Sequence, residues 1–236
     1  MISASFMKAE TKPTHVGFIM DGNRRWAREH GLPAFEGHRR GYEKMKEVGN
    51  WCLDNGVKNV TVYAFSTENW NRSREEVDYL MSLFERALRT GLEELKWQKF
   101  RLRVIGRRHG LPDKVIEAIE ATERATAGNS LGNYYIALNY GGRAEIVDGL
   151  KQIVKSGLPE DEIDEASFKK YLYAPEAPWP DLIIRASGEQ RLSGFLLWQS
   201  SYSELYFEQK FWPAFEESDF LAILKWYEER NRRFGK

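Results

Sequence analysis

Six short runs of apolar residues, rich in β-branched and aromatic types, recur along the chain, separated by turn residues and by stretches with helical spacing. The apolar runs predict strands at residues 15–20, 59–65, 101–106, 133–138, 181–184 and 204–207. The stretches with helical spacing predict helices at residues 38–54, 74–98, 112–126, 143–156, 167–172 and 217–233. Because strands and helices alternate, we expect an α/β fold with a mainly parallel sheet of about six strands surrounded by helices.

The chain of 236 residues has no internal repeat, low-complexity segment or Pro/Gly-rich linker, so we expect a single domain. Residues 1–14 lack the apolar segment of a signal peptide, which predicts a flexible N-terminal tail and a folded domain over residues 15–236. No apolar run approaches the roughly 18 residues that a transmembrane helix needs. The single cysteine, Cys52, cannot form an internal disulfide, which fits a cytoplasmic protein.

The net charge is zero, because 35 lysines and arginines balance 35 aspartates and glutamates. A chain with this balance is not a bulk polycation, so we expect no nucleic-acid partner. The basic residues are nevertheless clustered, with arginines crowded into residues 24–40 and further groups in "KFRLRVIGRRH" and "RNRRFGK". Local basic patches on a neutral protein are typical of binding to a small anionic ligand.

The predicted helix at residues 74–98 carries the clearest apolar face in the sequence. The residues with i, i+3, i+4, i+7 spacing on it are Val77, Leu80, Met81, Phe84, Leu88, Leu92 and Leu95. Such a face usually packs against a sheet, but it can equally line a slot for a hydrocarbon chain. The periodicity does not distinguish the two.

An acidic residue, a glycine and two arginines follow the first predicted strand, in "HVGFIMDGNRRW". Asp-Gly-Asn is common in ordinary turns. The same residues also suit a diphosphate with its metal ion, because ligands of parallel sheets bind beyond the carboxyl ends of the strands. Gly22 permits close approach of the backbone to phosphate oxygens, and the Asp21 carboxylate is a hard oxygen ligand suited to Mg²⁺.

Polar residues follow other predicted strands as well. Residues 65–72 form a polar loop with aromatic residues, which also suits an ordinary helix-capping loop, since Ser73 and Glu76 form a capping box at the start of the helix at 74–98. After the fifth strand, Arg185 and Arg191 stand with hydroxyl residues around a glycine, an arrangement that suits oxyanion recognition. Glu204 begins the sixth strand, where a charge is unusual if the strand is buried. Together these clusters favour a phosphorylated or diphosphorylated substrate over a binding module.

Several other chemistries are excluded by motif. The chain has no Walker A motif, no G-x-G-x-x-G after a strand, no G-x-S-x-G elbow and no H-E-x-x-H. Its histidines show no metal-ligand spacing. The acidic stretch at residues 160–165 is typical of a solvated first turn of a helix rather than of a metal site.

Long motifs in a fixed order make the chain similar to the cis-prenyltransferases, the family of undecaprenyl diphosphate synthase. These motifs are "HVGFIMDGNRRWA", "YAFSTENWNR", "NYGGR", "DLIIRASGEQRLSGFLLWQSSYSELYF" and the terminal "RRFG". The resemblance implies that isopentenyl diphosphate adds to an allylic diphosphate, such as farnesyl or geranyl diphosphate, with a new cis double bond and release of diphosphate. It also implies Mg²⁺ as cofactor, an apolar tunnel walled by the helix at 74–98, a homodimer, and peripheral membrane contact for product release.

The resemblance assigns roles to individual residues. Asp21 resembles the Mg²⁺ ligand, and Glu204 would reach the same ion from the partner subunit. Ser66 and Asn69 resemble residues that help remove the C2 proton of isopentenyl diphosphate, for which Asp21 and the diphosphate are further candidates. The terminal residues 233–235 resemble a motif that crosses the dimer interface. The residues implied in substrate binding are Gly22, Asn23, Arg24, Arg25, Trp26, His38, Phe65, Trp70, Arg72, Glu76, Arg185, Arg191 and Ser193.

The chain departs from the family pattern at positions that bear on substrate binding and product length. Many members carry an arginine where this chain has Ala34, so one phosphate contact is expected to come from elsewhere; the candidates are Arg24, Arg39 and Arg40. "NRRW" in place of "NGRW", and Gly194 in place of an asparagine, resemble short-chain members that make Z-farnesyl diphosphate. Ala64 resembles the long-chain type, in which a small residue leaves the tunnel open, and we favour a medium or long polyprenyl product.

Two alternative activities on the same fold stay open besides the long-chain synthase. One is a short-chain Z-farnesyl diphosphate synthase, and the other is an irregular coupler that joins two allylic units head-to-middle. A non-catalytic partner subunit is disfavoured, because such chains usually lose the motif carboxylate and the arginine clamp, and both are present here.

Overall fold

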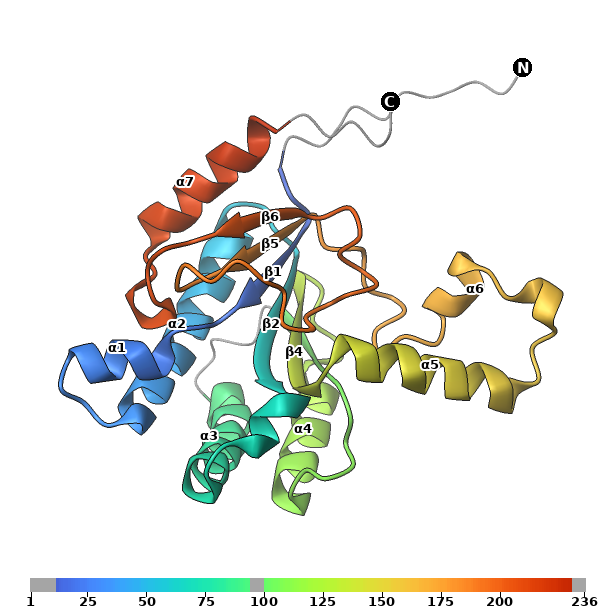
Figure 1. Ribbon diagram of the computed structural model, residues 1–236, viewed down its shortest axis with the longest axis horizontal. Coiled ribbons are helices and arrows are strands. Elements are labelled where there is room, and N and C mark those ends of the chain that lie inside the picture. Colours follow the sequence, from blue (N-terminus) through green and yellow to red (C-terminus); the bar gives the residue numbers. More distant parts are fainter. Residues whose placement is uncertain (1–11, 94–99, 231–236) are drawn as a thin grey trace.

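Six strands pair side by side in one sheet, in the order β3-β4-β2-β1-β5-β6, and all of them run parallel (Figure 1). The computed structural model describes residues 12–93 and 100–230. The strands are β1 (His15–Ile19), β2 (Asn59–Ser66), β3 (Phe100–Ile105), β4 (Gly132–Tyr140), β5 (Leu182–Arg185) and β6 (Glu204–Phe207). The predicted α/β fold with a parallel sheet is confirmed, and the described strands lie close to their predicted positions.

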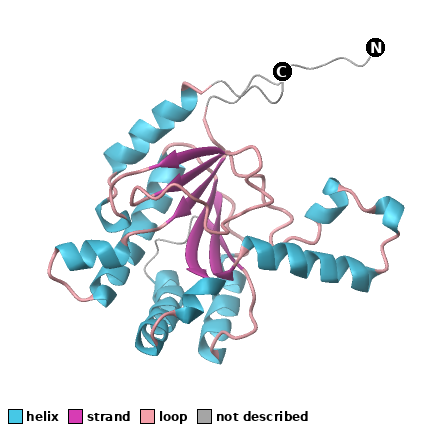
Figure 2. Cartoon of the chain, in the orientation of Figure 1, coloured by secondary structure: helices cyan, strands magenta, loops and turns pink. Residues whose placement is uncertain are grey.

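Helices surround the sheet (Figure 2). They are α1 (Asn23–Glu29), α2 (Ala34–Asp54), α3 (Arg74–Glu93), α4 (Asp113–Thr126), α5 (Gly142–Ser156), α6 (Glu165–Lys169) and α7 (Glu217–Glu228), with short 3₁₀ helices η1 (Thr67–Asn71), η2 (Glu160–Glu162) and η3 (Trp212–Ala214). The largest apolar cluster lies on one face of the sheet and joins it to α2, α3, α4 and α7. On the other face, Tyr173, Phe195 and Leu196 pack against the sheet. No helix in the described part of the chain is long and apolar enough to cross a membrane.

Several helices differ from the prediction. Helix α6 covers Glu165–Lys169 rather than residues 167–172, and α7 ends at Glu228, so the described residues 229 and 230 lie outside the helix that was expected to reach residue 233. Helix α1 is not among the helices predicted from apolar spacing, because this short helix buries only Ala27 and so has no apolar periodicity. Helix α2 begins at Ala34 rather than at residue 38, directly after Pro33, whose fixed φ suits a helix start. The predicted end of the third helix at 94–98, most of the predicted tail at 1–14 and the terminal residues 233–235 lie outside the described residues.

Helices α1 and α2 pack unusually closely, because α2 presents glycines to α1. A side chain at Gly37 would collide with the Asn23 carbonyl oxygen, and one at Gly41 would collide with the Asn23 side chain. The close approach brings the turn after β1 next to His38 of α2, which is buried. The glycines of α2 thus determine where the polar residues that follow β1 lie.

His15 at the start of β1 makes the stability of this fold sensitive to acid. Its ring is 2% exposed and lies 2.7 Å from the Pro178 carbonyl oxygen through Nδ1 and 2.8 Å from Thr61 Oγ1 through Nε2. The carbonyl can only accept, so Nδ1 carries the proton and Nε2 accepts from the Thr61 hydroxyl. Burial lowers the pKa of His15 from 6.5 to about 4, so the ring is neutral in the folded protein.

We therefore predict that wild-type protein loses stability through His15 between pH 6.5 and pH 4. In this range the unfolded chain binds a proton that the folded chain does not, which favours unfolding as the pH falls. The contribution approaches about 3 kcal/mol, since each pKa unit is worth about 1.4 kcal/mol. Urea unfolding at pH 7 and pH 4 should show this difference between wild type and His15→Gln, in which the position no longer titrates. Parallel pH dependence of the two proteins would contradict the prediction.

Candidate active site

A polar pocket of about 1270 Å³ opens at the carboxyl edge of the sheet, beyond the ends of β1, β2 and β5. Its walls come from α1, the segment after β2, the β4–α5 turn and the loop after β5. The sequence-predicted residues that line it are Asp21, Gly22, Asn23, Arg24, Arg25, His38, Ser66, Asn69, Arg72, Arg185, Arg191 and Ser193. Clusters that are far apart in sequence therefore meet, as expected for the carboxyl edge of a parallel sheet.

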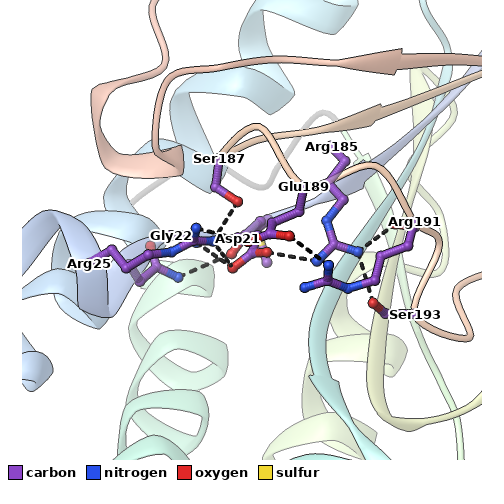
Figure 3. Close-up of polar contacts among 10 residues, drawn as sticks. Asp21, Gly22, Arg25, Arg185, Ser187, Glu189, Arg191 and Ser193 are labelled. Atoms are coloured by element: carbon purple, nitrogen blue, oxygen red, sulfur yellow. Dashed lines mark hydrogen bonds and ion pairs between the residues drawn. The ribbon is translucent and has the colours of Figure 1, made fainter.

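Asp21 stands at the centre of the polar contacts in this pocket (Figure 3). Arg185 Nη2 donates a hydrogen bond to Asp21 Oδ2 at 2.7 Å. The Gly22 amide donates to Asp21 Oδ1 at 2.6 Å, and Arg25 Nη2 lies 3.3 Å from the same oxygen. Burial raises the pKa of the Asp21 carboxyl, but the hydrogen bond and charge of Arg185, aided by Arg25, outweigh burial and leave the pKa below its usual value. Asp21 is therefore ionised at neutral pH.

Arg185 at the end of β5 connects two walls of the pocket. The residue is 4% exposed, and besides Asp21 its guanidinium donates from Nη1 to Ser193 Oγ at 2.8 Å and to the Arg191 carbonyl. Its Nε is buried and has no hydrogen-bond partner among the described residues. One buried cation thus fixes the loop after β5 relative to the end of β1.

The turn between β1 and α1 requires glycine at position 22. Gly22 has a φ of +94°, and a Cβ there would collide with the ring of Phe211. The Arg25 guanidinium lies over the same ring, 5.3 Å from its centroid. Phe211 thus supports both the turn and Arg25, a role that the sequence did not reveal because Phe211 lies far away along the chain.

A second charged cluster surrounds Glu76 of α3. Arg72 Nη1 donates to Glu76 Oε1 at 3.0 Å, His38 Nε2 lies 3.1 Å from this oxygen, and Arg24 Nη1 lies 3.5 Å from Oε2. Burial lowers the pKa of His38, and the hydrogen bond with Glu76 opposes this shift without cancelling it. Glu76 does not itself line the pocket, but it holds Arg24 and Arg72 beside it.

Of the three arginines considered as a replacement for the contact that Ala34 lacks, only Arg24 lines the pocket. Arg39 and Arg40 both donate to Glu36 on the exposed surface, with Nε–O distances of 2.8 and 3.2 Å. Ala34 itself lines the pocket. The space that an arginine side chain would occupy at this position is therefore part of the pocket.

Gly194 and the residue before it adopt left-handed backbone conformations, with φ of +82° at Gly194 and +50° at Ser193. Glycine and asparagine are the residues that enter this region most readily. Gly194 therefore meets the same backbone requirement as an asparagine would. Its presence does not by itself indicate a short product.

The loop after β2 is held by a reciprocal capping interaction. Asn69 Oδ1 accepts a hydrogen bond from the Ser66 amide at 3.1 Å, and the Ser66 side chain accepts from the backbone of η1 in return. Both residues line the pocket. The predicted capping contact of α3 is a separate one, in which the Glu76 amide donates to Ser73 Oγ at 3.3 Å.

Trp70 does not line the pocket and is anchored by a residue that the sequence analysis missed. The indole Nε1 donates to Asn139 Oδ1 at 2.8 Å, and Asn139 Nδ2 donates to the carbonyls of Arg107 and His109, both at 3.0 Å. Asn139 is 5% exposed and has a φ of +50°. It opens the "NYGGR" motif, which was the available signal for its importance.

Other predicted residues also lie outside the pocket lining. Trp26 stacks on His30 with ring centroids 4.3 Å apart. Phe65 is buried and packs edge-on against Trp70 and Phe84, with centroids 5.1 and 6.2 Å apart. These aromatic residues support the walls of the pocket from behind.

An apolar cavity of about 70 Å³ adjoins the polar pocket between α2, α3 and the sheet. The residues that line both spaces are Met20, Asn23, His38, Ala64 and Leu80. The apolar face of α3 has both of the functions left open by its periodicity: Leu80, Phe84 and Leu88 line the cavity, whereas Val77 and Met81 pack in the core. The side chain of Leu92, and Leu95 entirely, lie outside the described residues.

Asp21 is the residue of this pocket that fits Mg²⁺. Among the described residues no group of three or more His, Cys, Asp or Glu could hold a metal ion. A single ionised carboxylate nevertheless suits Mg²⁺, which proteins often bind through one or two carboxylates together with water and substrate phosphates. The donor set of the pocket therefore fits a magnesium ion that arrives with a phosphorylated ligand.

Glu204, the second predicted metal ligand, lies at the opposite end of the sheet from Asp21 within one chain. It begins β6 and is paired in register with Leu182 at the start of β5. Its carboxylate accepts a hydrogen bond from Arg230 Nε at 3.1 Å. Within one chain, Glu204 therefore does not approach Asp21.

A family model described as "Putative undecaprenyl diphosphate synthase" matches residues 19–235 of the chain. The chain is 50% identical over 230 residues to a tritrans,polycis-undecaprenyl-diphosphate synthase (geranylgeranyl-diphosphate specific) of Methanopyrus kandleri, across 95% of this chain and 85% of that protein. It is 48% identical over 225 residues to an isoprenyl transferase of Thermotoga maritima, across 94% of this chain and 97% of that protein. Among solved structures, lavandulyl diphosphate synthase from Lavandula x intermedia in complex with dimethylallyl diphosphate matches with a TM-score of 0.92 and 39% identity, across 96% of this chain and 100% of that one.

We predict that Asn139→Asp lowers the free energy of unfolding by about 1–3 kcal/mol, because a buried carboxylate cannot donate to the two carbonyls that Asn139 serves. Urea unfolding measures this loss. The matched control is Asn133→Asp on the same strand, where the half-buried amide donates to Asn59 Oδ1. Equal losses in the two variants would contradict the anchoring role of Asn139.

Proposed function

The chain belongs to the undecaprenyl diphosphate synthase family of cis-prenyltransferases, and we propose that it extends an allylic diphosphate with isopentenyl diphosphate to a medium- or long-chain Z-polyprenyl diphosphate. The observation that carries this proposal is the wall shared by the polar pocket and the apolar cavity. A ligand with a diphosphate head and a hydrocarbon tail fits such a junction, because its two ends need opposite environments. Small Ala64 lies at the junction and leaves room for the tail.

The primer that we propose is farnesyl, geranyl or geranylgeranyl diphosphate. The first two follow from the sequence resemblance. The third is added because the relative from Methanopyrus kandleri is named as geranylgeranyl-diphosphate specific. All three share the allylic diphosphate head, so they would use the same polar pocket and differ only in the length of tail that enters the cavity.

The proposed allylic subsite lies between Asp21 and α1. Arg25 and Asn23 would bind the diphosphate, with Arg24 as an additional cation where Ala34 leaves space. Asn23 supports this assignment by its position, because it lines both the pocket and the cavity. Its Nδ2 group, which donates to the Met20 carbonyl at 3.2 Å, is the part that would donate to a diphosphate oxygen. A primer bound here would direct its tail past Ala64.

The proposed isopentenyl diphosphate subsite lies on the opposite wall, at the loop after β5. Arg185, Arg191 and Ser193 would hold this diphosphate, and Ser66 and Asn69 would lie beside its alkene. Arg185 contacts both Asp21 and Ser193, so the two subsites are held next to each other through one side chain. Holding the alkene close to the allylic carbon is a large part of the rate enhancement such a site can supply.

The proposed reaction needs charge stabilisation rather than a covalent intermediate. Mg²⁺ held by Asp21 would neutralise charge on the departing diphosphate. Arg25 and Arg24 would add fixed positive charge next to the same leaving group, in a partly buried site where electrostatic interactions are strong. The lowered pKa of Asp21 keeps its carboxylate ionised, the form that either metal binding or proton acceptance requires.

We also propose that the active protein is a homodimer in which Glu204 of one subunit acts at the site of the other. Exposed apolar residues support this among the described residues: Val147, Leu150 and Val154 on α5, Leu205 on edge strand β6, and Tyr202 in the turn before β6. Val154 alone is 82% exposed. An apolar surface of this kind beside an edge strand suits association with a second copy.

A second candidate function is irregular coupling of two allylic diphosphates. The observation in its favour is the TM-score of 0.92 with a lavandulyl diphosphate synthase. Such an activity would use the same two subsites, with a second allylic diphosphate in place of isopentenyl diphosphate.

The experiment that tests the proposal is a product assay with Mg²⁺, labelled isopentenyl diphosphate and each of dimethylallyl, geranyl, farnesyl and geranylgeranyl diphosphate. We predict a ladder of long products from at least one of the longer primers. Asp21→Asn should lower turnover by at least about a hundredfold, since charge-stabilising groups of this kind are worth that much. It should also lower the free energy of unfolding, because buried Arg185 loses its carboxylate partner, so turnover is measured at a temperature where circular dichroism shows the variant to be folded. A single short product, or coupling of dimethylallyl diphosphate to itself, would overturn the chain-length proposal.

The shared site makes a separate prediction for mixed subunits. Asp21→Ala and Glu204→Ala proteins should each be nearly inactive, but a co-expressed mixture should regain about one quarter of wild-type activity. Half of the dimers then contain one subunit of each kind, and one of their two sites has both side chains intact. Activity equal to the average of the two parents would contradict a site completed across the interface.

A further inference from the structure

One carboxylate lies between arginines from opposite walls of the polar pocket. Glu189 Oε1 accepts a hydrogen bond from Arg25 Nη1 at 3.1 Å, and Glu189 Oε2 accepts from Arg191 Nη1 at 2.6 Å (Figure 3). Arg25 belongs to α1, whereas Arg191 belongs to the loop after β5. Glu189 therefore bridges the two halves of the pocket through the same donors that a bound oxyanion would use.

The two arginines depend on Glu189 to different degrees. Arg25 also donates to Ser187 Oγ at 2.7 Å and lies 3.3 Å from Asp21 Oδ1. Among the described residues, the Arg191 guanidinium forms its ion pair with Glu189 alone. Loss of the Glu189 carboxylate would thus free one guanidinium fully and the other in part.

Glu189 is suited to release these arginines. Its side chain is 33% exposed, so the carboxylate can turn into water without the cost of burying it elsewhere. The hydrogen bond and charge of Arg191 hold the pKa of the Glu189 carboxyl below its usual value, so it carries a full negative charge at neutral pH. A bound diphosphate and the Glu189 carboxylate would therefore repel each other while competing for the same two cations.

We propose that Glu189 is a competing anion of the substrate-binding site: it holds Arg25 and Arg191 when no diphosphate is bound and is displaced when one binds. The identity of the competing ligand as a diphosphate rests on the function proposed above. Competition weakens the binding of every diphosphate in the pocket. It also favours departure of the diphosphate released by each condensation, because Glu189 recaptures both arginines as that product leaves.

Binding of inorganic pyrophosphate tests this directly, since it requires no prenyl transfer. Titration calorimetry with Mg²⁺ present should give a dissociation constant about three- to tenfold lower for Glu189→Gln than for wild type, the range expected when two partly exposed ion pairs are lost. The matched control is Glu176→Gln, which removes a similarly exposed carboxylate whose partner, Arg103 at 3.0 Å, does not line the pocket, whereas Arg25 and Arg191 do. Its dissociation constant should equal that of wild type.

Two results would overturn the proposal. Unchanged binding in Glu189→Gln would mean that the carboxylate does not compete, and weaker binding would mean that it orients the arginines for the ligand instead. A double variant, Glu189→Gln with Arg191→Ala, should lose most of the gain seen in Glu189→Gln alone. These measurements also separate the two proposals, because tighter pyrophosphate binding without any prenyl transfer would support Glu189 as a competing anion while rejecting the synthase activity.

Discussion

The buried contact between Arg185 and Asp21 joins the ends of the neighbouring strands β5 and β1, and both halves of the proposed active site depend on it. Arg185 is almost fully buried and always charged, so its placement requires a carboxylate partner nearby. The same guanidinium holds Ser193 and the Arg191 carbonyl. A single cation thus sets the distance between the wall proposed for the primer and the wall proposed for isopentenyl diphosphate.

The second constraint on the site is that the polar pocket and the apolar cavity share part of their lining. Close packing of α1 on the glycines of α2 places Asn23 and His38 where the pocket meets the cavity. Seven arginines but only two carboxylates, Asp21 and Glu68, line the described pocket, so it has a net positive charge. Such a pocket attracts phosphorylated ligands, and the apolar wall beyond it selects those with a hydrocarbon tail.

The parallel sheet and the meeting of polar clusters at its carboxyl edge could be predicted from the sequence, because strand type and strand direction follow from local composition and connection length. Helix α1 could not, since it buries one alanine and shows no periodicity. Asn139, Phe211 and Glu189 were missed for a different reason. Their importance arises from neighbours in space: Asn139 anchors Trp70, Phe211 supports Gly22 and Arg25, and Glu189 bridges arginines that are far apart in the chain.

The apolar face of α3 shows that hydrophobic periodicity does not distinguish a residue that only packs in the core from one that lines a cavity. Leu80 and Leu88 belong to the core and also line the cavity, whereas Val77 and Met81, which share their spacing, belong to the core without lining it. Glu204, the charged residue of β6, lies far from Asp21 within its own chain. Its proposed role at the metal therefore requires a second subunit, whose position a sequence pattern does not give.

The most direct test of the central claim is a crystal structure of the protein with Mg²⁺ and an unreactive thiolo analogue of geranylgeranyl diphosphate. The shared wall predicts electron density for the diphosphate beside Asp21 and Arg25, with the tail passing Ala64 and Leu80 between α2 and α3. A diphosphate bound away from Asp21, or a tail lying along the protein surface outside the cavity, would contradict the junction of pocket and cavity as the site of chain elongation.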